Sequence, residues 1–99
     1  MTKKAKSRAV LVCTEFRGVF YGRSTDPLEA TTVTLTGMRN CLAWDKATGG
    51  VFGLAEKGPT PGCRIGMKVA GPAVLQKVTF IAEVTDEAAK AWESAPSVS

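Results

Sequence analysis

The sequence contains no histidine, only three cysteines and no long apolar run. Without imidazole, Ser-His and Cys-His nucleophilic pairs are excluded, and most mononuclear metal sites lose their usual ligand. Three cysteines are an odd number and none lies in a Cys-x-x-Cys pair, which argues against both a disulfide framework and a cysteine-ligated zinc site. We therefore expect a non-enzymatic protein with no catalytic residue, no metal and no cofactor.

Two further classes are excluded by pattern. No apolar stretch approaches the roughly 18 residues that a membrane span requires, and the first residues lack the apolar centre of a signal peptide. We therefore expect an intracellular protein that does not enter a membrane. Gly53 and Gly58 have the spacing of a phosphate-binding loop, but Pro59 and Thr60 follow where that motif requires lysine and then serine or threonine.

The net charge of +4 is concentrated at the N-terminus. It equals the charge of four basic residues, Lys3, Lys4, Lys6 and Arg8, and the remainder of the chain is neutral. Ninety-nine residues fit one domain, so we predict a flexible basic arm at 1–8, a single β-rich domain at 9–95 and a tail at 96–99. The arm could contact phosphate, although a solvated terminus is the simpler interpretation.

Short apolar or alternating segments predict a series of strands. The first should be buried on both faces, whereas the third should have one wet face of threonines and be broken or bent by Gly37. The last should be the longest. The five predicted strands are Ala9–Cys13, Val19–Tyr21, Thr31–Thr36, Asn40–Trp44 and Leu75–Val84.

A terminal helix should follow the last strand. Thr85 or Asp86 is a suitable N-cap, and Trp92 falls on the same helical face as Ala88, so that the indole packs back on the sheet. Together these elements predict a mainly β (α+β) fold: a small twisted antiparallel sheet or an SH3-like, partly open barrel with one C-terminal helix. For 51–57, a short helix ended by Gly58 and a strand edge both fit the pattern.

Six of the ten glycines lie between Gly49 and Gly66, and Pro59 and Pro61 restrict the same stretch. We interpret it as a shaped loop that a β scaffold presents. Arginine grips phosphates or carboxylates, aromatic rings stack on flat ligands, and glycine-rich backbone offers N–H groups to anions. The candidate binding residues are therefore those in or near the loop and the first turn: Arg39, Trp44, Thr60, Arg64, Tyr21 and Arg23.

Each candidate also has an ordinary structural interpretation. Trp44 could pack in the core, and Tyr21 could be a half-buried strand residue. The two arginines at 39 and 64 could be solvated, or could pair with Asp45 or Glu56.

Several segments between residues 10 and 93 resemble a family of small, uncharacterised tailed-bacteriophage proteins with a glycine-rich central segment. They are Arg17-Gly18-Val19-Phe20, Val33-Thr34-Leu35, Arg39-x-Cys41-x-x-Trp44, Gly49-Gly50-Val51-x-Gly53-Leu54-Ala55, Gly58-Pro59-x-x-Gly62-Cys63-x-Ile65-Gly66 and Thr85-Asp86-Glu87-Ala88-x-x-Ala91-Trp92-Glu93. The resemblance implies a phage protein made in the host bacterial cytoplasm, and it transfers no functional residue.

We therefore expect a phage accessory module that binds a host protein or a small anionic ligand through 49–66, for example in counter-defence. Two alternatives remain open. A small sheet leaves edges that a second copy of the chain can cover, which suggests a homo-oligomer or a virion component. The basic arm suggests nucleic-acid binding, with an affinity that falls steeply with salt.

Overall fold

The computed structural model describes residues 7–15, 18–44 and 46–97. The strands are β1 (Arg8–Thr14), β2 (Val19–Ser24), β3 (Val33–Ala43), β4 (Arg64–Ile65), β5 (Ala73–Leu75) and β6 (Val78–Glu83). A 3₁₀ turn (Lys46–Thr48) precedes helix α1 (Gly50–Glu56), and helix α2 (Asp86–Ser94) follows β6. Neither helix of this described part has the length and apolar character needed to span a bilayer.

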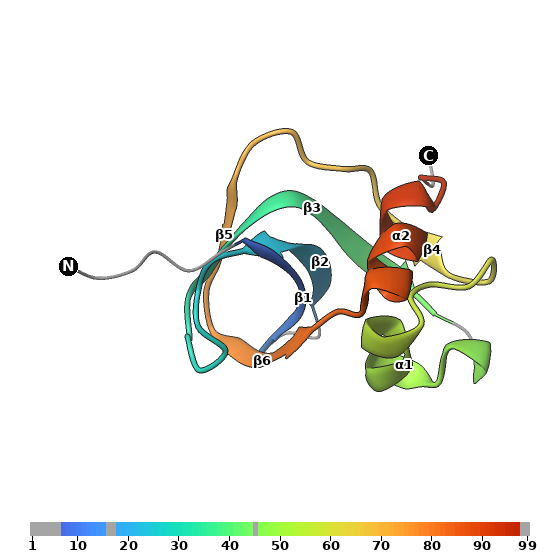
Figure 1. The fold of residues 1–99 in the computed structure, drawn as a ribbon, viewed down its shortest axis with the longest axis horizontal. Helices are drawn as coiled ribbons and strands as arrows, with labels where there is room; N and C mark the ends of the chain where they lie inside the picture. The colour runs from blue at the N-terminus through green and yellow to red at the C-terminus, as the bar shows by residue number, and fades with distance from the viewer. Residues whose placement is uncertain (1–6, 16–17, 45, 98–99) are drawn as a thin grey trace.

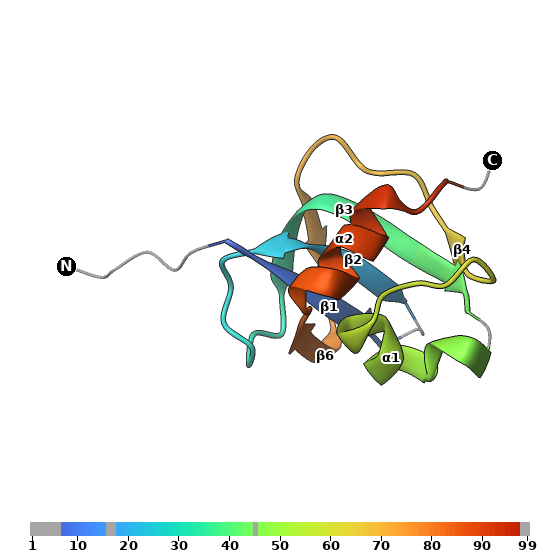
Figure 2. The ribbon, with the colours of Figure 1, turned by 45° about the vertical axis from the view of Figure 1, so that its right-hand side comes forward.

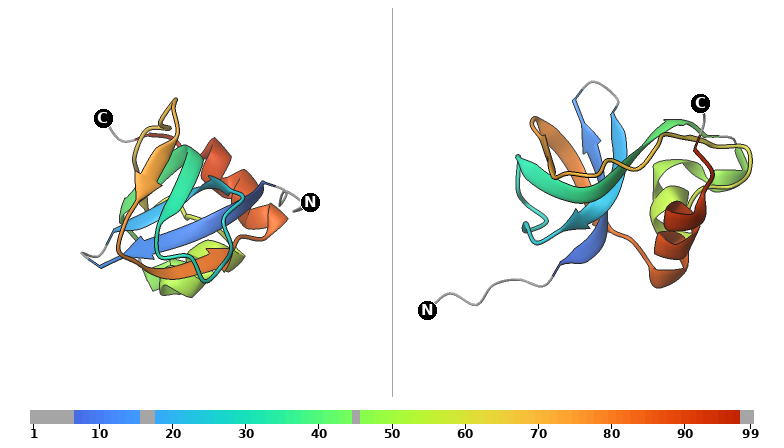
Figure 3. Two further views of the ribbon diagram at one scale, coloured as in Figure 1. Left: turned by 90° about the vertical axis from the view of Figure 1, so that its left-hand side faces the viewer. Right: turned by 90° about the horizontal axis from the view of Figure 1, so that it is seen from above.

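The six strands form one antiparallel sheet in the order β4-β3-β2-β1-β6, and β5 pairs with the start of β3. Only Gln76 and Lys77 separate β5 from β6, so the sheet curves round until its two sides approach each other (Figure 1). The predicted fold class, mainly β with a small twisted antiparallel sheet and a C-terminal helix, is confirmed. Both helices lie together on one side of the barrel (Figure 3).

The sheet separates two apolar clusters, and β1 contributes to both. Val10 and Val12 face the barrel interior, whereas Ala9 and Leu11 face the helices. All four are buried, as the apolar run in this segment predicts. Trp92 of α2 packs in the helix-side cluster, as its position on the apolar helical face predicts.

Strand β3 replaces the two strands predicted at 31–36 and 40–44. Of the two effects expected of Gly37, a break or a bend, the structure shows a bend at a bulge. The pairing of β2 with β3 passes from Tyr21–Arg39 to Arg23–Thr36, so β3 carries one extra residue at this point. Gly37, with a φ of 61°, accommodates this bulge in the left-handed region that other residues avoid. Because side chains alternate along a strand, the extra residue reverses which face the following side chains occupy.

The prediction of a single strand at Leu75–Val84 is wrong, because the structure has two strands here, β5 and β6. Lys77, with a φ of 56°, turns the chain between them. As a result β5 continues the sheet beside β3, β6 continues it beside β1, and β3 is the longest strand. The short strand β4 lies inside the glycine-rich stretch and pairs with the end of β3.

The helical interpretation of 51–57 is correct, and helix α1 lies beside α2 (Figure 2). Gly58 follows the C-cap with a φ of 85°, as expected for a glycine that ends a helix. Helix α2 begins as predicted, because the Thr85 hydroxyl accepts the Ala88 N–H at 3.1 Å. The same hydroxyl donates to the Glu56 carbonyl at 2.6 Å and so ties the two helices together.

The predicted basic arm requires one correction. Arg8 is the first residue of β1, its Nε contacts the Glu83 carboxylate at 3.2 Å, and its guanidinium donates to the Ser24 carbonyl. Arg8 therefore belongs to the folded domain. Lys3, Lys4 and Lys6 lie outside the described residues.

Candidate functional site

The six predicted binding residues do not form one site. Tyr21 and Arg39 are buried between the sheet and the helices. Arg23 is exposed near the first turn, where it donates to the Ser7 carbonyl at 3.1 Å. Arg64 and Trp44 are exposed near each other, because Arg64 pairs with Ala43, the residue before Trp44.

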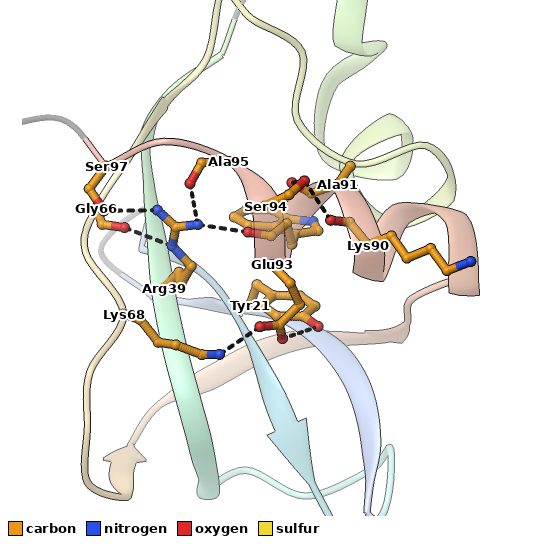
Figure 4. Close-up of polar contacts among 11 residues, drawn as sticks. Tyr21, Arg39, Gly66, Lys68, Lys90, Ala91, Glu93, Ser94, Ala95 and Ser97 are labelled. Atoms are coloured by element: carbon orange, nitrogen blue, oxygen red, sulfur yellow. Dashed lines mark hydrogen bonds and ion pairs between the residues drawn. The ribbon is translucent and has the colours of Figure 1, made fainter.

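Arg39 lies in the interior with 3% of its surface exposed. Its Nε donates to the Gly66 carbonyl at 2.9 Å, and one terminal nitrogen donates to the carbonyls of Trp92 and Ala95 at 2.8 and 2.6 Å (Figure 4). The other terminal nitrogen contacts the Ser97 hydroxyl at 3.1 Å. The guanidinium, predicted to grip an anion, thus holds the C-terminal end of α2 and the following chain against β3.

Tyr21 stacks on Trp92, with ring centroids 5.2 Å apart and planes inclined by 6°. The Tyr21 hydroxyl donates to Glu93 Oε2 at 2.8 Å, and Lys68 Nζ contacts Glu93 Oε1 at 2.7 Å (Figure 4). Burial and the bond to Glu93 raise the pKa of the Tyr21 hydroxyl. Tyr21 therefore fastens α2 to the sheet, and its ring is covered.

The Glu93 carboxylate gives the protein a specific acid sensitivity. Partial burial raises the pKa of this carboxyl, but hydrogen bonds from Lys68 and Tyr21 outweigh it, so the pKa falls below 4.5. The Glu93 carboxyl therefore binds its proton more tightly in the unfolded chain than in the folded protein. The contribution of ionised Glu93 to the free energy of unfolding is present above pH 4.5, and it is lost as the pH falls towards the pKa of Glu93 in the folded protein. Urea unfolding below pH 4.5 should show a steeper loss of stability for the wild type than for Glu93→Gln.

The matched control for this prediction is Glu87→Gln, which changes an exposed carboxylate at the opposite end of the same helix. Its stability should follow the wild-type dependence on pH. Parallel curves for Glu93→Gln and the wild type would show that the Tyr21–Glu93–Lys68 contacts do not couple protonation to folding.

The glycine-rich stretch 49–66 is packed against the framework instead of standing free. Leu54, Ala55 and Ile65 are buried, and the Leu54 carbonyl accepts the Trp92 indole N–H at 3.0 Å. Thr60 is half-buried beside Cys63, whose sulfur accepts the Thr60 N–H at 3.4 Å. The Phe52 side chain, by contrast, points outwards from α1 with 72% of its surface exposed.

Phe52 meets the sheet at β6. Its ring lies edge-on to Phe80, with centroids 5.8 Å apart and planes inclined by 65°. Phe80 in turn lines a hollow of about 330 Å³ between β6 and the segment that precedes β3. The hollow is formed by Leu28, Glu29, Ala30, Thr31, Val78, Thr79, Phe80 and Ile81. The exposed ring of Phe52 and the half-buried ring of Phe80 therefore adjoin a hollow whose walls are partly apolar and partly polar.

Strand β6 also ends the sheet. The Val84 N–H donates to the Ala9 carbonyl at 3.0 Å, which identifies one hydrogen-bonded pair in the β1–β6 ladder. Because such pairs alternate, the backbone groups of Ala82 and Phe80 point to β1, and those of Ile81 and Glu83 point away from it. Within the described part of the chain, no strand pairs with this outer edge.

Among the described residues, no cluster of histidine, cysteine or acidic side chains could hold a metal ion. Every buried side-chain nitrogen and oxygen in the described ranges has a hydrogen-bond partner within the protein. Burial, followed by the neighbouring Cys63, raises the pKa of the Cys41 thiol to about 12, where it is a poor nucleophile.

Sequence reasoning missed Phe52, Phe80 and the outer edge of β6. An available signal was the phenylalanine at position 52, because glycines surround it and a short glycine-rich helix has little apolar face to bury. The edge itself carried no comparable signal, since the strand order decides which strand is last.

Residues 7–92 match a protein family described as a domain of unknown function (DUF6948). No curated protein and no solved structure is similar enough to match the chain. The match covers the barrel and nearly all of α2.

Proposed function

The chain belongs to this family of unknown function, and from its geometry we propose a non-enzymatic protein-binding module. Its contact surface comprises Phe52, Phe80 and the outer edge of β6, which we call the edge surface. The observation that carries the proposal is that the exposed Phe52 ring contacts the half-buried Phe80 on β6, whose outer edge pairs with no strand in the described part of the chain. Part of the surface lies in the glycine-rich stretch that the sequence singled out.

Energetic considerations support a partner at this surface. Burying a phenylalanine side chain contributes roughly 1.5–3 kcal/mol, and Phe52 forgoes most of that in the isolated chain. Single exposed apolar residues are ordinary, but here Phe52 continues into Phe80 and the hollow. Aromatic side chains at the centre of a contact supply much of the binding energy of protein interfaces.

The structure gives less support to the other binding functions that the sequence suggests. A small anionic ligand is less favoured, because Arg39 donates to protein oxygens on all sides. Nucleic-acid binding would depend on Lys3, Lys4 and Lys6. The bacteriophage origin, the bacterial cytoplasmic setting and the counter-defence role stay part of the proposal as predictions from the sequence resemblance.

A photo-crosslinking experiment tests the edge surface. A benzophenone amino acid at position 52, in protein expressed in bacterial cells, should give a crosslinked product of defined mass. The purified partner should then bind the unmodified protein, and Phe52→Ser should weaken that binding by at least about tenfold, the ratio for 1.4 kcal/mol.

Met67 provides a matched control, because it is also 72% exposed and lies in the segment after β4. Benzophenone at position 67 should give no such product, and Met67→Ser should leave the affinity unchanged. Equal crosslinking at both positions, or none at position 52, would contradict the proposed function.

A further inference from the structure

We infer that the partner contributes an extended segment that pairs with the outer edge of β6 as an additional strand, with an apolar side chain in the hollow and a basic residue near Glu83. This inference rests on the proposed function and names the kind of partner that the edge surface accepts.

The backbone provides the first argument. Ile81 and Glu83 direct their N–H and C=O groups away from β1, at the last strand of the sheet. An extended peptide satisfies such groups by forming a ladder, and alternate side chains then provide specificity. At Val78 the outer edge of β6 is already occupied, because the Val78 N–H donates to the Thr31 carbonyl at 3.0 Å. The peptide would therefore pair with β6 only beyond this residue, towards Glu83.

The hollow provides the second argument. Its volume of about 330 Å³ is at the lower limit of ligand pockets, which run from roughly 300 to 1,000 Å³. Its walls include Leu28 on one side and Val78 and Ile81 on the other. Such a space suits one or two apolar side chains of a strand that lies along β6.

Charge provides the third argument. Glu29 lines the hollow, and Glu83 ends β6 with 62% of its side chain exposed. Asp86 and Glu87 follow in the first turn of α2. Arg8 contacts one oxygen of Glu83, and the other oxygen can accept a second cation. The end of the edge near Glu83 is therefore acidic, and it would attract a basic residue of the partner.

A second copy of the chain fits this edge less well. The segment Leu28–Thr31 stands across the hollow from β6, and the Val78–Thr31 bond closes one end of the opening. A second barrel would bring its own copy of that segment into the same narrow space. A single extended peptide carries no such bulk.

Two sets of synthetic nine-residue peptides, in which valine and threonine alternate, test the inference. One set has lysine at either end and the other has glutamate at the same positions. The lysine peptides should slow hydrogen exchange at the Ile81 and Glu83 amides, and their affinity should fall with salt. The glutamate peptides should bind about tenfold more weakly, equivalent to 1.4 kcal/mol.

Two substitutions at one position separate the backbone from the charge. Glu83→Gln keeps the outward backbone N–H but removes the charge, so the affinity for the lysine peptides should fall to that for the glutamate peptides. Glu83→Pro also removes the N–H, at an edge position where proline is tolerated, and should abolish binding of both sets. If Glu83→Pro does not fold, the exchange rates of the wild-type amides still decide the question.

Exchange at Ile81 and Glu83 that no peptide alters would overturn the inference. Protection that rises with protein concentration in the absence of peptide, together with a doubled mass in sedimentation, would assign the edge to a second copy and would also overturn it. Neither result would contradict the proposed function, which depends on a partner that crosslinks at position 52. Conversely, peptide protection without that crosslink would contradict the proposed role of Phe52 alone.

Discussion

Replacing Arg39 with methionine should lower the free energy of unfolding by about 3 kcal/mol, since the variant leaves the Gly66, Trp92 and Ala95 carbonyls without their charged donor. Methionine preserves most of the apolar stem, so the loss reports the hydrogen bonds rather than a cavity. In a domain of this size each kcal/mol shifts Tm by roughly 4–8 °C. Urea and thermal unfolding of the purified variant measure the effect.

Two further arginine variants make this result specific. Arg39→Lys should recover only part of the stability, because an ammonium group cannot reproduce the planar fork that reaches several acceptors at once. Arg23→Met removes an exposed arginine from the neighbouring strand and should change stability by less than about 0.5 kcal/mol. A wild-type midpoint for Arg39→Met would mean that the buried guanidinium does not hold α2 in place.

Replacing Trp92 with alanine should cost about 3–5 kcal/mol, as expected for the truncation of a large buried aromatic residue. Trp92 is fully buried, stacks on Tyr21 and donates to the Leu54 carbonyl, so the variant weakens the contacts of α2 with both the sheet and α1. Total stabilities of roughly 5–15 kcal/mol are usual, so the variant should be partly unfolded at moderate temperature. Loss of the near-ultraviolet circular dichroism signal provides a direct measurement.

The second tryptophan of the chain is a natural control for this variant. Trp44 is 40% exposed, and Trp44→Ala should leave the unfolding midpoint close to that of the wild type. Trp92→Phe retains an aromatic ring beside Tyr21 but loses the indole N–H, and it should cost about 1 kcal/mol. Comparable losses for Trp44→Ala and Trp92→Ala would contradict the assigned position of the core.

Local patterns predicted those elements whose determinants lie within a few residues. The apolar run of β1 and the cap at Thr85 were predicted, because each depends on neighbours in the sequence. The segment that forms α1 fitted both a short helix and a strand edge. The strand boundaries around Gly37 and Lys77 were not predicted. Both residues have positive φ values, and whether such a residue breaks a strand or bends it depends on which strands pair on either side.

The position of Arg39 illustrates why the candidate site could not be predicted. Val33 and Leu35 face the barrel interior, and strict alternation would send the side chain of residue 39 to the same face. The bulge at Gly37 adds one residue and turns Arg39 towards the helices instead. The guanidinium that we expected to bind a ligand therefore makes internal hydrogen bonds, because of a register shift that the composition does not encode.

The acceptors of Arg39 impose an order of events on synthesis. Strands β1, β2 and β3 precede the glycine-rich stretch, but the Trp92 and Ala95 carbonyls and the Ser97 hydroxyl emerge from the ribosome more than fifty residues after the arginine. Until then the two terminal nitrogens of the guanidinium must remain hydrated, and the face of the sheet that α2 will cover stays exposed to solvent. In a nascent chain the final locking of this domain is therefore a step that follows translation of residue 97.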